Sequence, residues 1–197
     1  MNIYKSHRLA KQNGFTLIEI GVVITVLGIL AILAVRGFDM LNKSKASVES
    51  VNVTDTVNSV QTCFSKATDF TGLGASASTG TTYAITNCDV AISNPPASND
   101  GSTITNQFGG ARTIARASIN GGTNNAVLVS NAAVPRDVCA GMVQGIWDVS
   151  NIITLTPLAG AAVTVKSTYD QRYAPDAIAA CKTATSVTID ITRAKNG

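Results

Sequence analysis

The side chains that could carry out acid–base or metal chemistry are few in this sequence. The only histidine is His7, and it lies in a polar leader, residues 1–14, which we expect to be removed. Without it, the mature protein would have no imidazole to act as a general base or a metal ligand. The 12 acidic residues are scattered and form no recognisable catalytic pair. We therefore predict that the protein is not an enzyme and holds no metal or other cofactor.

The four cysteines, Cys63, Cys88, Cys139 and Cys181, form the second group of reactive side chains. An even number of cysteines in an exported segment indicates two disulfide bonds, for which three pairings are possible. We prefer Cys139–Cys181, which would join two short helices, together with Cys63–Cys88, which would fasten a loop to a long helix. Zinc binding is the alternative, but the sequence has no CxxC spacing and no histidine beyond the leader.

The third chemical feature is one acid inside an apolar segment. Residues 15–35 form a run of 21 residues whose only ionisable side chain is Glu19. As a helix rising ~1.5 Å per residue, this run would be about 30 Å long, enough to cross the hydrocarbon core of a bilayer. The basic residues of the leader should then remain in the cytoplasm. A charge at this depth is costly and usually has a partner.

Two ordinary membrane-targeting signals are alternatives. A secretory signal fits poorly, because its apolar stretch is about 7–15 residues long and ends at a small-residue cleavage site. A plain signal anchor, in which Glu19 is tolerated by chance, is the interpretation that composition alone would favour. The sequence around the start of the apolar run argues against both.

The hexapeptide that joins the leader to the apolar run is Gly14-Phe15-Thr16-Leu17-Ile18-Glu19. It closely resembles the type IV prepilin signature, in which a glycine precedes an N-methylated residue and a glutamate follows four positions later. The resemblance implies that a membrane-embedded aspartyl peptidase cuts the Gly14–Phe15 bond and methylates the new amino terminus. It also implies that Glu19 of one subunit pairs with the Phe15 amine of its neighbour during assembly. The Glu19 carboxylate could instead pair with the Phe15 amine of its own chain and interact with the dipole of its own helix, since Phe15 lies four residues away.

The apolar pattern continues beyond the run, which predicts one helix from about Phe15 to about Lys66. Its second half should be amphipathic and lie on a globular head. The apolar positions are Phe38, Leu41, Val48, Val51, Val53, Val57, Val60 and Phe64. The polar positions assigned to other faces are Asp39, Asn42, Lys43, Lys45, Glu49, Asn52, Asp55 and Asn58. We thus expect a cleaved leader at 1–14, a transmembrane and polymerisation half-helix at 15–35, an amphipathic half at 36–68 and a disulfide-bonded head at 69–197.

The head is rich in Gly, Ser, Thr, Asn and Ala, with short alternating apolar stretches. Residues 71–100 are typical of a loop because they contain two turn signals. Four segments alternate as strands do, and two are better explained as short helices. Packed on the long helix, antiparallel strands would give an α+β fold. The expected strands are 113–119, 126–130, 161–167 and 186–191, and the expected helices are 135–147 and 174–182.

Two motifs of the head resemble a subgroup of the same family. Thr103–Gly110 (TITNQFGG) precedes a predicted strand, and Val134-Pro135 precedes Cys139 in a predicted helix. Both features are similar to those of type IVb S pilins, found in thin, conjugation-associated and bundle-forming pili. There the helix carries the first cysteine of a carboxy-terminal disulfide loop. Phe15 and the short leader are more like type IVa pilins, and Gly74–Ser93, with Cys88, matches no pattern that we can name.

The charge distribution excludes nucleic acid as an expected partner. Three of the 15 basic residues lie in the leader, which has no acid, so 12 basic and 12 acidic residues remain. No basic patch of the kind that phosphate binding requires is left.

The resemblance implies a fibre subunit, held first in a bacterial inner membrane and then in an extracellular pilus. Its implied partners are copies of itself, the prepilin peptidase, an assembly platform and its ATPase. Its implied roles are adhesion, aggregation or mating contact. The alternatives are a minor pilin or type II secretion pseudopilin, and, in another class, a single-pass anchored periplasmic binding protein.

Overall fold

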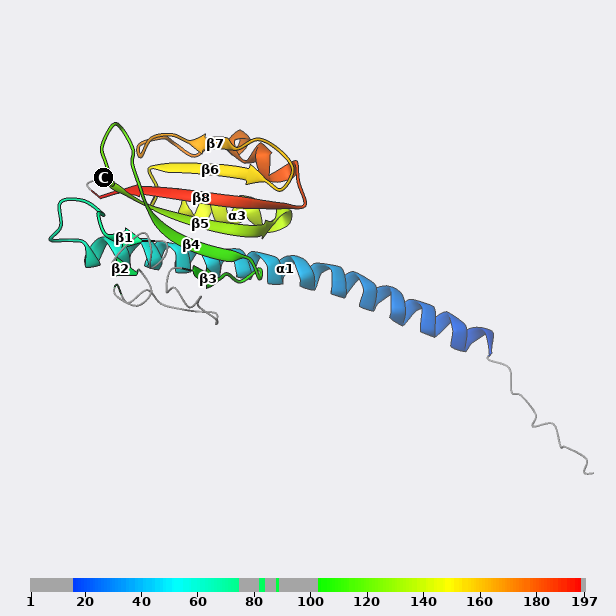
Figure 1. Ribbon diagram of the computed structural model, residues 1–197. Coiled ribbons are helices and arrows are strands. Elements are labelled where there is room, and N and C mark those ends of the chain that lie inside the picture. The colour runs from blue at the N-terminus through cyan, green and yellow to red at the C-terminus, as the bar shows by residue number, and fades with distance from the viewer. Residues whose placement is uncertain (1–15, 75–81, 84–87, 89–102, 196–197) are drawn as a thin grey trace, which may run out of the picture. The chain divides into compact units, whose positions relative to one another are not determined.

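The computed structural model describes residues 16–74, 82–83, 88 and 103–195 (Figure 1). The chain divides into two compact units, Met1–Met40 and Leu41–Gly197, which are described separately here. Helix α1 contributes to both units. The elements are α1 (Leu17–Cys63), β1 (Leu73–Gly74), β2 (Thr82–Tyr83), β3 (Thr103–Thr105), β4 (Ala111–Ala117), β5 (Ala126–Pro135), α3 (Arg136–Ile146), β6 (Ile152–Pro157), β7 (Val163–Lys166), η1 (Pro175–Lys182) and β8 (Ser186–Ala194).

The head is built on a six-stranded sheet with the order β3-β4-β5-β8-β6-β7 (Figure 1). All five pairs of neighbouring strands are antiparallel. Buried and partly exposed residues alternate along β6 and β8, as expected when one face of a sheet is covered. The covered face forms one hydrophobic core with α3 and with the part of α1 beyond Leu41. The predicted α+β fold with an antiparallel sheet is therefore confirmed.

The buried face of α1 differs in part from the predicted one. Val53, Val57, Val60 and Phe64 are buried in the core as expected. The earlier apolar positions Leu41, Val48 and Val51 are instead 44–60% exposed, and the side chain of Phe38 lies outside those described. Their places against the head are taken by Ala46, Glu49 and Ser50, which are all buried. These three residues were not predicted to be buried, because a small or charged side chain does not mark the apolar face of a helix in the sequence.

Four short strands, β1, β2, β3 and β6, were not predicted. Strand β6 was missed, although its sequence IITLTP alternates. Residues 103–105 form β3 rather than part of a turn, since they pair with β4. The prediction that 71–100 is a loop throughout was wrong, because β1 and β2 form a parallel pair there. The turn signals at 94–96 and 99–101 lie outside the described residues.

In the TITNQFGG motif, the residues that follow β3 form a turn held together by the side chain of Asn106. Asn106 Oδ1 accepts hydrogen bonds from the backbone N–H groups of Phe108 and Gly110, both at 2.9 Å, and Asn106 Nδ2 donates to Ala132 O at 2.7 Å. A Cβ atom at Gly110 would lie only 2.1 Å from that same oxygen. Gly109 has φ +81°, a conformation that glycine adopts without strain. The turn thus requires the asparagine and both glycines.

Helices α1 and α3 approach each other at small residues. A Cβ atom at Gly145 would lie 2.6 Å from Ser50 Oγ and 2.8 Å from Ser50 Cβ. Ser50 Oγ in turn donates a hydrogen bond to Ala46 O at 2.8 Å, so it is held in place. A Cβ atom at Gly141 would lie at an ordinary contact distance of 3.6 Å from Ala46 Cβ. Only one of the two glycines is therefore required by packing.

We predict that Gly145→Ala is less stable than Gly141→Ala by about 1–3 kcal/mol, the usual cost of overpacking. Both substitutions gain the same helix propensity, roughly 1 kcal/mol, so their difference isolates the contact with Ser50. Denaturant unfolding of the two full-length variants measures it. Equal stabilities would show that the helices do not approach as closely as described.

Candidate functional site

The N-terminal part of α1, residues 17–33, has no core of its own. Every large apolar side chain in it is half exposed or nearly so, from 49% at Val26 to 91% at Leu17. Burying one such side chain is worth roughly 1.5–3 kcal/mol, so a segment of this kind is unfavourable in water. Its apolar side chains must be shielded from water by lipid or by other protein chains. We call residues 17–33 the apolar segment.

Glu19 lies at the start of the apolar segment, in the first turn of α1, and its side chain is exposed. The Glu19 backbone N–H donates to Thr16 O at 3.0 Å and to Thr16 Oγ1 at 3.3 Å, so Thr16 caps the helix. A threonine followed three residues later by glutamate is a capping-box spacing, which the sequence analysis overlooked. A carboxylate is also favoured in this turn by the helix dipole. The first turn of α1 is therefore capped by Thr16, and the Glu19 carboxylate lies at the end of the helix where a negative charge is favoured.

The other predicted processing residues lie outside the described part of the chain. These are Gly14 and Phe15, on either side of the expected cleavage site; the rest of the leader, with His7, also lies outside the described residues. The pairing of Glu19 with a Phe15 amine therefore remains a prediction. Within the residues that the structure does describe, none of the helices has both the length and the apolar content of a membrane span.

Two disulfide bonds hold the head, Cys63–Cys88 and Cys139–Cys181. This is the pairing that the sequence analysis preferred among the three. The second bond joins α3 to η1 across 42 residues of sequence, and the first ties the end of α1 to Cys88 across 25. Closing loops of these lengths restricts the unfolded chain enough to contribute ~3–4 kcal/mol each.

The two disulfides differ in their access to solvent. Cys139 and Cys181 are at most 2% exposed, whereas Cys63 is exposed on the surface of α1. Because a thiolate must reach a sulfur atom to exchange with it, we predict that a mild reductant opens Cys63–Cys88 severalfold faster than Cys139–Cys181. A time course of reduction with dithiothreitol, followed by alkylation and peptide mapping, measures both rates. Simultaneous opening would mean that global unfolding, rather than local access, controls reduction.

A buried ion pair connects α1 to the sheet. Glu49 and Arg112 are 0% and 1% exposed, and the Glu49 carboxylate accepts hydrogen bonds from Arg112 Nε, at 3.2 Å, and from Nη2. Asn131 Oδ1 accepts a further bond from Arg112 Nε at 3.1 Å, and the backbone N–H of Gln107 donates to Glu49 Oε2 at 3.2 Å. Glu49 was expected to lie away from the buried apolar face of the helix, which is wrong because its side chain is buried. The signal that the sequence analysis lacked was Arg112, 63 residues away, because a charge becomes tolerable inside a protein only with such a partner.

A second buried cation holds the C-terminal end of α3. Lys166 Nζ donates to Ser150 O at 2.7 Å and to Trp147 O, and it lies 5.2 Å from the centre of the Trp147 ring. Burial lowers the pKa of Lys166, and the negative charge of Asp148 opposes this effect. The Lys166 amine donates hydrogen bonds to two backbone carbonyls that follow α3, and this favours a structural role over a catalytic one.

The described residues contain no group of three or more histidine, cysteine, aspartate or glutamate side chains arranged to hold a metal ion. The ionisable groups that are buried, Glu49, Arg112 and Lys166, all make the structural contacts given above. What the described residues offer is therefore an exposed apolar segment with an acid at its start, and a head held by a hydrophobic core and two disulfides.

Comparison with known proteins gives two family matches. Residues 43–194 match the family described as PilS N terminal, and residues 9–35 match the prokaryotic N-terminal methylation motif. No curated protein has a sequence that matches this chain.

Solved structures share its fold. The chain is similar to the crystal structure of the type IVb pilin from Salmonella typhi, with 17% identity and a TM-score of 0.52, over 73% of this chain and 96% of that one. It is also similar to TcpA, a type IV pilin from Vibrio cholerae El Tor biotype, with 16% identity and a TM-score of 0.48, over 78% of this chain and 99% of that one.

Proposed function

The chain belongs to the PilS N-terminal family, and from this premise we propose that it is a structural subunit of a type IV pilus of the IVb group. The family is one of structural rather than catalytic proteins. The main support for this proposal is the apolar segment. All its large apolar side chains are exposed in the single subunit, and the same segments of other copies could shield them from water. A rigid head on such a helix is what a fibre subunit requires.

The proposed route to the fibre begins in the inner membrane. The 21-residue apolar run would hold the precursor there as a single-pass protein, with its basic leader in the cytoplasm. A prepilin peptidase would cut between Gly14 and Phe15 and methylate the Phe15 amine. The match of residues 9–35 to the methylation motif supports this step. An assembly platform and its ATPase would then move the mature subunit from the membrane into an extracellular fibre.

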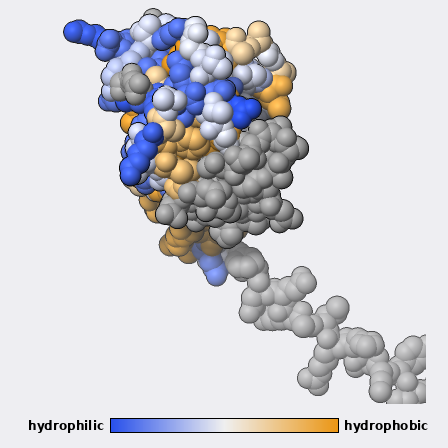
Figure 2. Space-filling model, turned by 60° about the vertical axis from the view of Figure 1, so that its left-hand side comes forward, coloured by the Kyte–Doolittle hydropathy of each residue, from blue (hydrophilic) through white to orange (hydrophobic). Residues whose placement is uncertain are grey.

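The surface of the head suits a fibre exterior. On the face of the molecule that Figure 2 shows, hydrophilic residues cover much of the described surface, with smaller hydrophobic areas between them. Outside the leader, basic and acidic residues are equal in number. Adhesion, aggregation or mating contact would follow from such an exposed head.

Glu19 and the disulfides bear on the choice among related subunits. A shaft subunit needs the acid at the start of its helix, whereas a subunit at the tip of a fibre can dispense with it. The Cys139–Cys181 bond in the carboxy-terminal half resembles pilins more than type II secretion pseudopilins. We therefore propose a shaft role, with a minor pilin or pseudopilin as the second candidate.

The amino-terminal residue of the exported protein tests this proposal. We expect N-methyl-phenylalanine at Phe15, detected by mass spectrometry of protein sheared from the cell surface, and filaments composed of this chain. An intact Met1 on protein that remains monomeric in the membrane would instead favour an anchored periplasmic protein.

A further inference from the structure

The side chain of Thr16 marks the point where helix α1 begins. Thr16 is itself outside the helix, and its carbonyl oxygen accepts a helical hydrogen bond from the N–H of Ile20 at 3.2 Å. Its hydroxyl oxygen Oγ1 accepts from the backbone N–H of Glu19 at 3.3 Å. This is the geometry of an N-cap, whose side chain satisfies one of the N–H groups that the first turn of a helix leaves without an acceptor. The first helical residue is therefore Leu17.

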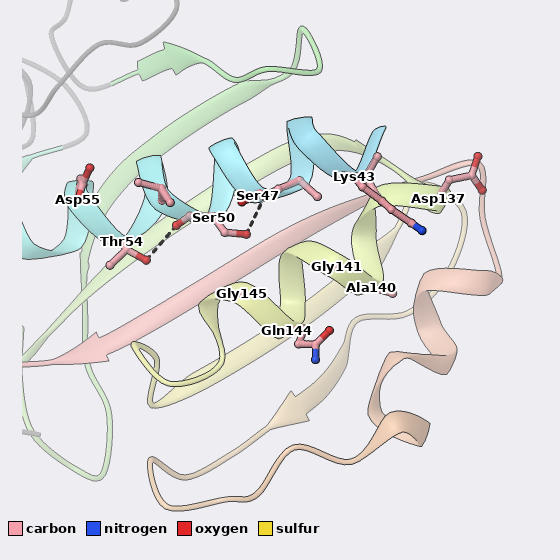
Figure 3. A pocket seen from close by; sticks show the side chains of 13 residues that line it. Lys43, Ser47, Ser50, Thr54, Asp55, Asp137, Ala140, Gly141, Gln144 and Gly145 are labelled. Atoms are coloured by element: carbon pink, nitrogen blue, oxygen red, sulfur yellow. Dashed lines mark hydrogen bonds between the residues drawn. The ribbon is translucent and has the colours of Figure 1, made fainter. Parts of the chain in front are cut away.

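Other hydroxyl side chains of α1 make the opposite kind of hydrogen bond. They donate to the carbonyl oxygen four residues earlier, as serine and threonine do inside a helix. Figure 3 shows two of these bonds, from Ser50 to Ala46 O at 2.8 Å and from Thr54 to Ser50 O at 2.9 Å. In the apolar segment, Thr25 Oγ1 donates in the same way at 2.8 Å. Thr16 differs from these residues because its hydroxyl accepts, at the residue that precedes the helix.

The N-cap lies next to the proposed processing site. The Gly14–Phe15 bond directly precedes Thr16 in the sequence, within the residues 9–35 that match the methylation motif. A peptide bond in a hydrogen-bonded helical turn must open before a protease can bind it, so the rate of cleavage follows the population of the open form. Because the first turn of α1 begins at Leu17, the bond to be cut precedes that turn.

Asn13 is an alternative N-cap in the same stretch of sequence. Asparagine is among the best N-cap residues, and a helix capped at Asn13 would include Gly14, Phe15 and Thr16 as its first three residues. The bond to be cut would then lie inside the first turn. A threonine at position 16 opposes this earlier start in two ways, because it caps the later start and because its helix propensity is low.

We propose that Thr16 is a positioning residue for removal of the leader. By capping α1, it holds the Gly14–Phe15 bond outside the helix, where a peptidase can bind it in an extended form. Hydrolysis adds water across this bond, so that Gly14 gains the new carboxylate and Phe15 keeps the new amine. The inference rests on the proposed processing, and it gives the Thr16 hydroxyl a role that acts through the backbone of its own chain.

The rate of leader removal from the full-length precursor tests this role. In membranes that contain a prepilin peptidase, Thr16→Ala should be cleaved about two- to fivefold more slowly than the unaltered chain, the change in population that loss of an N-cap produces. Thr16→Ser keeps the acceptor and should be cleaved at the normal rate. Thr25→Ala is the matched control, because it removes a hydroxyl of the same helix that caps nothing. Since only the rate changes, Thr16→Ala should still be cleaved completely in time, and the final yield of fibres should change little.

A second substitution separates capping from direct recognition by the peptidase. Asn13→Ala removes the alternative cap, so the double variant Thr16→Ala/Asn13→Ala should be cleaved at nearly the normal rate. The ¹³Cα chemical shifts of Gly14 and Phe15 in the uncut precursor, measured in detergent micelles, provide a readout without the peptidase. They should move toward helical values in Thr16→Ala and return in the double variant.

Three results would count against this role. Cleavage of Thr16→Ala at the normal rate would overturn the inference and leave the fibre function standing. Slow cleavage of Thr16→Ala that Asn13→Ala does not restore would also overturn it, because the peptidase would then recognise the Thr16 side chain itself. Failure of the unaltered precursor to be cleaved at all would remove the proposed processing, and the inference with it.

Discussion

Glu19→Ala subunits will fail to form fibres on their own, although they will be cleaved and will fold. If Glu19 pairs with the Phe15 amine of a neighbour at ~4 Å, the Coulomb energy is about 4 kcal/mol at an effective dielectric constant near 20. Each contact between subunits would then be weakened by up to roughly a thousandfold. The yield of sheared filaments from cells that express only the variant measures this effect.

Two further variants separate the pairing from the role of Glu19 in its own helix. Thr16→Ala removes the hydroxyl that accepts from the Glu19 N–H, a cap worth about 1 kcal/mol, and should leave assembly close to normal. Glu19→Ala subunits mixed with unaltered subunits should enter fibres, because their amines can pair with the Glu19 of a neighbour. If they are excluded from mixed fibres while Thr16→Ala also fails, Glu19 acts within its own chain. Normal polymerisation of Glu19→Ala alone would reject the pairing altogether.

The second large effect is expected in the head, where Glu49→Leu will lower the free energy of unfolding by about 3–5 kcal/mol. The substitution leaves Arg112 buried, at 1% exposure, without its carboxylate, and it removes the acceptor of the Gln107 N–H. For a chain of this size, such a loss corresponds to a fall in Tm of roughly 6–20 °C. Thermal unfolding followed by circular dichroism, on the full chain in detergent, measures it.

The double variant Glu49→Leu/Arg112→Met provides the internal check. It leaves neither charge unpaired, so it should recover much of the stability that the single variant loses. Asp55→Ala, a neutralised acid on an exposed position of the same helix, should change stability by no more than about 0.5 kcal/mol. If Glu49→Leu were as mild as Asp55→Ala, the ion pair would contribute nothing measurable to the head.

These two predictions concern different parts of the molecule. The acid at the start of the apolar segment is exposed, so we expect its loss to affect assembly and to leave the fold intact. The acid at position 49 is buried, so its loss should affect the fold first and assembly only as a consequence. The same residue type therefore has opposite expected phenotypes 30 positions apart, because its surroundings differ.

Much of the fold could be predicted because it depends on local patterns. The long helix, α3 and strands β4, β5, β7 and β8 each follow from a periodicity of apolar residues within a short window. Strand β6 was not predicted, although its sequence alternates in the same way. The pair β1–β2 could not be predicted, since each strand has only two residues and no period to detect.

The sequence by itself determined the apolar segment with its one acid, the α+β class of the head and a preferred disulfide pairing, while the leader boundary at Gly14–Phe15 stays a prediction. These features depend on residue type and on spacing along the chain, so they can be inferred without knowing which distant residues come into contact. Only the tertiary structure decided which face of α1 is buried, because packing against α3 selects small residues such as Ala46 and Ser50 over the larger Val48 and Val51. It also paired Glu49 with Arg112, since contacts between distant residues depend on how the elements pack together.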